Sequence, residues 1–135
     1  MSKFTESVAA YIEKHPTLYI CVLKVENAFK KPAFKCQECG ECILSTTAFT
    51  CPMRCPKELR NGPCGGTRPD GHCEAYPERD CIWHLIYTRA EKLDRLEMLT
   101  PVQKPHDHRL KGSSAWLNMM AGRIPGWKWR KSPKG

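Results

Sequence analysis

The sequence predicts a small metal-stabilised domain of helices and irregular structure, in which cysteine-rich loops are flanked by helices and followed by an extended basic C-terminal tail. Eight of the nine cysteines lie between residues 36 and 81, among many Gly and Pro residues. The chain of 135 residues is modest in aliphatic content, and small domains of this kind usually depend on metals or disulfides. The formal charge of +8 is uneven, because residues 104–135 carry eight Lys and Arg against Asp107 alone.

The clustered cysteines are the candidate ligands of a metal centre. The first three form a C-x2-C-x2-C run, which presents three thiolates from one short loop. Such a run is typical of iron–sulfur cluster loops, in which a distant cysteine supplies the fourth ligand. Eight thiolates make two sets of four, so the pattern predicts two [4Fe–4S] clusters, held by Cys36, Cys39, Cys42, Cys51, Cys55, Cys64, Cys73 and Cys81.

Zinc and disulfides are the alternatives for these cysteines. Zinc takes four ligands, usually as two close pairs, and zinc at one or both sites stays open. Disulfides are disfavoured because they belong to oxidising compartments and because nine is an odd number. The first 20 residues show no secretory leader, since Glu6, Glu13 and Lys14 interrupt every apolar run. No apolar run reaches the length of a membrane span, and we expect a cytoplasmic protein.

Helices are predicted on both sides of the cysteine region. Apolar spacing predicts a helix over residues 4–13, which Pro16 should end. The run from Leu18 to Phe29 suits a buried strand or a helix, and helix is favoured; Cys21 within it is expected to be a buried thiol. A short helical turn is expected over residues 57–60. A longer helix should begin at Ile82 and stop at Pro101. We therefore divide the chain into segments 1–33, 34–100 and 101–135.

The basic tail is predicted to dock on another protein. A short helix is expected over residues 115–120, and the side chains proposed as anchors are Trp116, Leu117, Trp127 and Trp129. Tryptophan and arginine are enriched in protein interfaces, and the chain contains no recognised nucleic-acid module, so nucleic acid is the less favoured partner.

The sequence contains no catalytic motif. There is no Ser-His-Asp pattern, phosphate loop or dinucleotide fingerprint, so no catalytic residue is expected. His72, His106 and His108 are expected at the surface, because eight cysteines already suffice as ligands.

Three segments together resemble a known family: CQECGECILSTTAFTCPMRCPKELRNGPCGG, GHCEAYPERDCIWHLIYTR and GSSAWLNMMAGR. They are similar to the cysteine-rich accessory domain of methylenetetrahydrofolate reductase, which occurs as a separate small subunit or fused to the C-terminal side of the reductase barrel. The resemblance implies a partner subunit with a (β/α)8 barrel and a bound FMN or FAD. It also implies electron delivery from a donor such as ferredoxin or a larger redox complex. The expected role is iron–sulfur electron transfer to that flavin; the alternative is a zinc-stapled structural module that positions the reductase.

Overall fold

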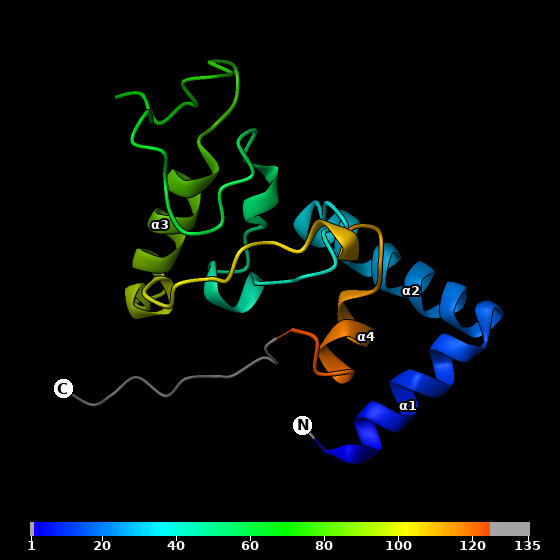
Figure 1. The fold of residues 1–135 in the computed structure, drawn as a ribbon. Coiled ribbons are helices and arrows are strands. Elements are labelled where there is room, and N and C mark those ends of the chain that lie inside the picture. The colour runs from blue at the N-terminus through cyan, green and yellow to red at the C-terminus, as the bar shows by residue number, and fades with distance from the viewer. Residues whose placement is uncertain (1, 125–135) are drawn as a thin grey trace. The chain divides into compact units, whose positions relative to one another are not determined.

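The computed structural model describes residues 2–124, which form two compact units (Figure 1). The helical unit contains the described residues up to Cys42 and those from His106 onward. The loop unit contains residues 43–105. These units divide the chain after residues 42 and 105, whereas the division made from the sequence falls after residues 33 and 100. The segment that follows residue 105 therefore folds together with the N-terminal helices.

Two consecutive helices, α1 (Lys3–Lys14) and α2 (Pro16–Phe34), begin the helical unit. Helix α1 agrees with the helix predicted over residues 4–13. The prediction that Pro16 ends this helix is confirmed, because α1 stops at Lys14 and His15, the residue before the proline, has an extended backbone (φ −111°, ψ 96°), as proline favours for the residue that precedes it. Pro16 itself opens α2. Proline suits the first turn of a helix because an N–H at that position has no intrahelical partner.

Helix α2 settles the ambiguous run from Leu18 to Phe29, all of which is helical. The expectation that Cys21 is buried is wrong, because its side chain is exposed. The buried residues of α2 are Glu26 and Lys30, five and nine positions further along. At 100° per residue these positions lie on the far side of the helix from Cys21.

The C-terminal part of the helical unit contains the 3-10 turn η4 (His108–Leu110) and helix α4 (Ala115–Met120). The short helix predicted over residues 115–120 is thus confirmed. Leu117 is only 1% exposed, and α4 packs against α1, so the prediction that Leu117 anchors a partner is wrong. Trp127 and Trp129 lie outside the described residues.

The loop unit contains helix α3 (Ile82–Lys92) and the 3-10 turns η1 (Leu44–Thr46), η2 (Pro52–Arg54) and η3 (Leu96–Leu99). Its hydrophobic cluster consists of Ile82, Trp83 and Ile86, all on α3. The indole N–H of Trp83 donates a 3.0 Å hydrogen bond to the Leu59 carbonyl. Cys55 and Cys81 pack against the same cluster, so two candidate ligands lie next to this core.

Two local predictions in the loop unit are wrong. Residues 57–60 are not helical, since Glu58 has a left-handed backbone (φ 51°), and the helical turn is instead η2. Helix α3 ends at Lys92 rather than at Pro101, because Asp94 also takes a left-handed conformation (φ 52°). Across residues 2–124, no helix is long and apolar enough to cross a membrane.

Candidate metal centre

The eight candidate ligands are distributed between the two units. Cys36, Cys39 and Cys42 belong to the helical unit, and Cys51, Cys55, Cys64, Cys73 and Cys81 belong to the loop unit. Cys39 and Cys51 are buried, Cys64 is exposed, and the others are half-buried. Cys21, the cysteine left out of the predicted ligand set, is exposed on α2.

The loop carrying the first three cysteines has a backbone that turns sharply at two places. Glu38 and Gly40 both have positive φ, 54° and 74°. The Glu38 N–H donates a hydrogen bond to Cys36 Sγ at 3.4 Å. A Cβ at residue 40 would lie 2.1 Å from the carbonyl oxygen of Leu110, so only glycine fits there. The loop is therefore shaped both to donate N–H groups to sulfur and to lie close to the segment around η4.

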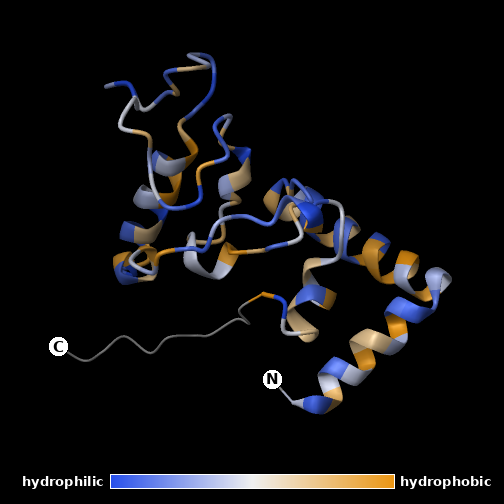
Figure 2. Ribbon diagram, viewed as in Figure 1, coloured by the Kyte–Doolittle hydropathy of each residue, from blue (hydrophilic) through white to orange (hydrophobic). Residues whose placement is uncertain are grey.

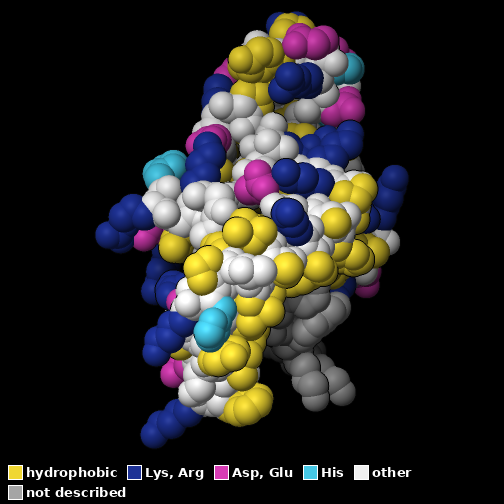
Figure 3. Space-filling model, turned by 90° about the vertical axis from the view of Figure 1, so that its right-hand side faces the viewer, with side chains coloured by type: hydrophobic (Ala, Val, Ile, Leu, Met, Phe, Trp, Pro, Cys, Tyr) yellow, Lys and Arg dark blue, Asp and Glu magenta, His cyan; other side chains and the backbone are white. Residues whose placement is uncertain are grey.

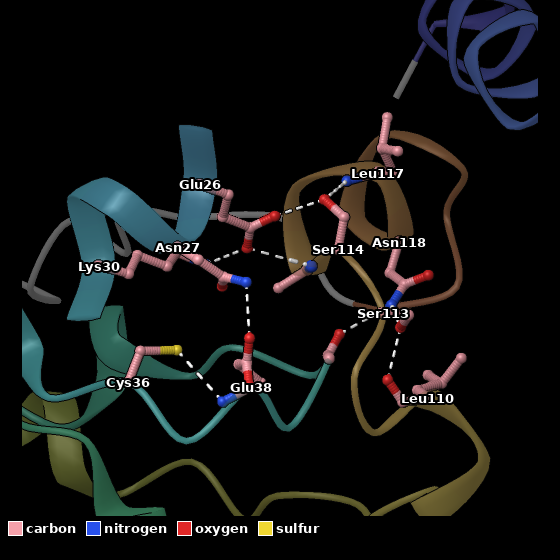
Figure 4. A network of polar contacts seen from close by, with 12 residues as sticks. Glu26, Asn27, Lys30, Cys36, Glu38, Leu110, Ser113, Ser114, Leu117 and Asn118 are labelled. Carbon is pink, nitrogen blue, oxygen red and sulfur yellow. Dashed lines mark hydrogen bonds and ion pairs between the residues drawn. The ribbon is translucent and has the colours of Figure 1, made fainter. Parts of the chain in front are cut away.

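That segment holds the loop through direct hydrogen bonds (Figure 4). The Asn118 side-chain amide donates to the Gly40 carbonyl at 2.9 Å, and Asn118 is 2% exposed. The Gly112 N–H donates to the Glu38 carbonyl at 2.7 Å. Residues 112–118 thus fix the cysteine loop, which gives a structural role to the GSSAWLN segment noted in the sequence.

His106 also contacts the loop. Its Nε2 lies 3.0 Å from the Cys39 carbonyl oxygen and 3.6 Å from a Glu41 carboxylate oxygen, and its side chain is 6% exposed. The expectation that His106 lies at the surface is therefore wrong, because the ring packs against the Cys39 loop. Its Nδ1 is buried and has no hydrogen-bond partner among the described residues.

A buried ion pair lies behind the same loop (Figure 4). Lys30 Nζ is 2.6 Å from Glu26 Oε1, and the two side chains are 6% and 4% exposed. The Glu26 carboxylate also accepts hydrogen bonds from the Ser114 hydroxyl and, at 3.2 Å, from the Ala115 N–H. The pair joins α2 to the start of α4. The indole of Trp116 faces Lys30, with the ammonium 5.6 Å from the ring centroid.

The cysteines Cys42 and Cys36 lie near enough to Lys30 to affect its pKa. Burial by itself lowers the pKa of the Lys30 ammonium, but the negative charge of a Cys42 thiolate and the hydrogen bond to Glu26 outweigh burial, so its pKa is raised; Cys36 adds to the effect. The helical unit therefore supplies a buried positive charge beside candidate ligands that must be deprotonated to bind metal.

The loop unit repeats the contact between an N–H and a cysteine sulfur. The Gly66 N–H donates to Cys64 Sγ at 3.4 Å, again from two residues further along the chain. The Thr67 hydroxyl lies 3.1 Å from Cys81 Sγ, in a contact in which either atom can donate. Hydrogen bonds to sulfur stabilise a thiolate and tune a metal bound to it.

The last two cysteines stand at the ends of a closed loop. His72 and Asp80 form an isolated antiparallel bridge. The Cys73 N–H donates to the Arg79 carbonyl at 2.8 Å, and the Cys81 N–H donates to the Gly71 carbonyl at 2.9 Å. This pairing brings the backbones of Cys73 and Cys81 to one end of the loop, although they are eight positions apart in the sequence.

In the loop unit, Lys57 lies near the thiol of Cys64. Lys57 forms an ion pair with Glu74, and Cys64 Sγ lies 3.8 Å from the same carboxylate. The hydrogen bond from Lys57 lowers the pKa of Glu74 and raises that of Lys57, and the Cys64 charge contributes to the rise. Lys57 and Glu74 are exposed, so the ion pair is screened by water.

The chemistry of these loops fits a thiolate-bound metal group. Two loops direct N–H groups at cysteine sulfur, and each unit places a lysine beside its thiols. The side chains themselves are not gathered: across residues 2–124, no three His, Cys, Asp or Glu side chains are grouped so as to hold a metal ion. The ligand set thus stays a prediction. The sequence analysis did not predict roles for Glu26, Lys30 and Asn118. The only signal for them in the sequence is the four-residue spacing of Glu26 and Lys30, which suits an ion pair on a helix.

Comparison with known proteins identifies the family. A family model described as "Methylene-tetrahydrofolate reductase C terminal" matches residues 15–109, which include α2, α3 and all eight clustered cysteines. Comparison with curated proteins and with solved structures found no match. Because the matched range covers well over half of the 135 residues, the chain belongs to the methylene-tetrahydrofolate reductase C-terminal family.

Proposed function

We propose that this chain is the iron–sulfur electron-transfer part of a methylenetetrahydrofolate reductase system. The observation that carries the proposal is the coincidence of the family match, residues 15–109, with all eight clustered cysteines. Two [4Fe–4S] clusters, when bound, would accept and release single electrons at potentials set by their surroundings.

The residues of this chain would have three roles toward such clusters. The cysteines would supply four thiolates to each. The N–H groups of Glu38 and Gly66 would donate to ligand sulfurs, which favours the more negative, reduced form. Lys30 and Lys57 would act more weakly in the same direction, because each ammonium is already paired with a carboxylate, Glu26 or Glu74.

The proposed partner is the flavin-bearing reductase subunit. Reduction of a methylene group to a methyl group needs two electrons, and flavin is the cofactor that connects one-electron donors with hydride transfer. This division of labour explains why the present chain contains no catalytic motif of its own. The tetrahydrofolate substrate would bind to the partner, and the donor would be ferredoxin or a larger redox complex.

Metal analysis of protein purified without oxygen tests the proposal. We expect brown protein with about eight iron and eight acid-labile sulfide per chain, since each [4Fe–4S] cluster contains four of each. Cys39→Ser should lower both values, whereas Cys21→Ser is the matched control and should leave them unchanged, because Cys21 lies on the exposed face of α2.

The opposite outcome is equally clear. Colourless protein with stoichiometric zinc and no sulfide would overturn the cluster proposal. It would support the alternative in which the cysteines hold zinc and the chain only stabilises or positions the reductase.

A further inference from the structure

Helix α2 buries a charged pair and exposes large apolar side chains, unlike an ordinary surface helix. Its buried residues are the charged Glu26 and Lys30, whereas Leu18, Val25 and Phe29 are 40%, 62% and 60% exposed. Surface helices normally direct their apolar stripe at the core and their charges at water. The apolar side chains of α2 are therefore not explained by packing within the helical unit.

The exposed residues form a continuous stripe along one face of α2. They recur at intervals of three and four residues, as an apolar seam between two helices does, and comprise Leu18, Cys21, Val25, Ala28 and Pro32, with Phe29 alongside. Figure 2 shows hydrophobic positions along the α2 ribbon. Figure 3, which views the α1–α2 side of the molecule, shows a band of hydrophobic side chains with lysine and arginine around it.

The inner face of α2 explains how the stripe comes to point outward. Glu26 is held by the hydrogen bonds from Ser114 and Ala115. The Tyr19 hydroxyl accepts a 3.3 Å hydrogen bond from the Ser114 N–H, and Asn27 donates to Glu38 at 2.6 Å. These contacts fix the rotation of the helix about its axis, so the stripe stays exposed to solvent.

Lysines border one edge of the stripe. Lys24, Lys31 and Lys35 are exposed there, Lys31 pairs with Glu38 at 3.2 Å, and Glu26, the sole carboxylate in α2, is buried. A second copy of this face would bring lysine against lysine, which disfavours self-association. The seam is one side chain wide and includes small and β-branched residues, as in helix–helix packing, and it contains none of the Trp residues that anchor membrane-surface helices.

We propose that the α2 stripe docks an amphipathic helix of the reductase subunit, one whose apolar seam is bordered by Asp and Glu. This inference rests on the proposed function, because it takes the partner from the family to which the chain belongs. The apolar seam would hold the complex together, and the lysines would accelerate its formation and make it sensitive to salt.

The test measures binding of the purified flavin-bearing reductase subunit to the full chain under nitrogen. Val25→Glu places a charge at the middle of the seam and should weaken binding about tenfold or more. The matched control is Val102→Glu, the same change at a residue of the loop unit that is 87% exposed, and it should bind as the unaltered chain does. Lys24→Glu should slow association at low salt and have little effect at high salt.

The outcomes separate this proposal from the proposed function. Three outcomes would each overturn the docking proposal. The Val25→Glu chain binds the reductase as well as the unaltered chain does; or the unaltered chain binds anionic vesicles and not the reductase, and Val25→Glu abolishes that binding; or sedimentation equilibrium shows a dimer that Val25→Glu abolishes. Iron and sulfide content and helicity are measured on every variant. Full clusters with reductase binding that does not depend on Val25 would overturn the α2 docking alone. Full clusters with no reductase binding by the unaltered chain would overturn the proposed partner as well, whereas absence of iron and sulfide would overturn the cluster assignment alone.

Discussion

Replacing only one member of the buried pair of Glu26 and Lys30 should lower the free energy of unfolding by at least as much as replacing both members. The pair is separated by 2.6 Å and is almost fully buried, and Glu26 has two further hydrogen-bond donors. Removing one partner of such a pair leaves an uncompensated buried charge and costs about 3–5 kcal/mol. We expect Glu26→Gln to cost about 3 kcal/mol, because the amide still accepts one hydrogen bond. Lys30→Met should cost about 2 kcal/mol, because the carboxylate keeps its other two donors.

The double variant decides whether the two residues act as a pair. Glu26→Gln with Lys30→Met should also cost about 2 kcal/mol, so the coupling free energy should be about 3 kcal/mol. The assay is urea unfolding under nitrogen, followed by circular dichroism, on variants that retain the metal content of the unaltered chain. Lys31→Met is the matched control, because Lys31 pairs with Glu38 at 3.2 Å but is half exposed, and its loss should cost less than about 1 kcal/mol. Additive single changes of under about 1 kcal/mol each would refute the reasoning.

Two other positions in the helical unit give sharp expectations. Gly40→Ala should destabilise the cysteine loop and lower the metal content, because the new Cβ would lie 2.1 Å from the Leu110 carbonyl oxygen. Gly112→Ala is the control, because Gly112 also has a positive φ but has open space around it, and metal analysis should show a much smaller loss. The hydrogen bonds from Arg109 lower the pKa of Asp107 from 3.8 to about 2. Stability from this contact is complete above pH 3.8 and is lost as the pH falls toward 2, so Arg109→Ala should flatten the acid limb of a pH–stability curve, and an unchanged limb would contradict the assignment.

The helices were largely predictable because their signals are local. Apolar spacing placed α1 and α4, and it placed the start of α3 at Ile82. The C-terminal ends of the helices were less predictable. Helix α2 ends next to Lys35 and helix α3 ends close to Asp94, both of which have a left-handed backbone, and no strong sequence signal marks either residue. Proline has two different roles here: Pro16 ends α1 through the extended residue before it and opens α2, whereas Pro32 lies within α2.

The burial of side chains on α2 could not be predicted locally. Glu26 and Lys30 have the spacing of an ordinary surface pair, and what buries them is Ser114, 88 residues further along the chain from Glu26. The same contact turns Cys21 outward and so reverses the expectation made for it. The cysteine motif itself is visible in the sequence, but its division between the units depends on how the segment after residue 105 folds back.

The loop unit offers the strongest physical reason for a bound metal. From residue 56 to residue 81, all of which the structure describes, no residue is buried. Ordering a backbone residue costs about 1–2 kcal/mol of conformational free energy, and burial of apolar surface is the usual compensation. Here that compensation is small, because Leu59 and Cys81 are only partly buried against the α3 cluster, while Cys64, Cys73 and Cys81 all lie in the segment. Ligand bonds to a metal group would supply the missing stabilisation, as in other small metal-dependent domains.

Removal of the metal should therefore unfold this segment and spare the helices of the helical unit. After oxidative bleaching and chelation, trypsin should cleave rapidly after Arg60 and Arg79, while the helical signal of α1 and α2 in circular dichroism should persist, because Ala9 and Leu117 keep their packing without the cysteines. Cleavage within α2, after Lys24, should stay slow and serves as the internal control. If Arg60 and Arg79 remain as protected as in the untreated protein, the segment is held by its own hydrogen bonds and the argument for a metal-dependent loop unit fails.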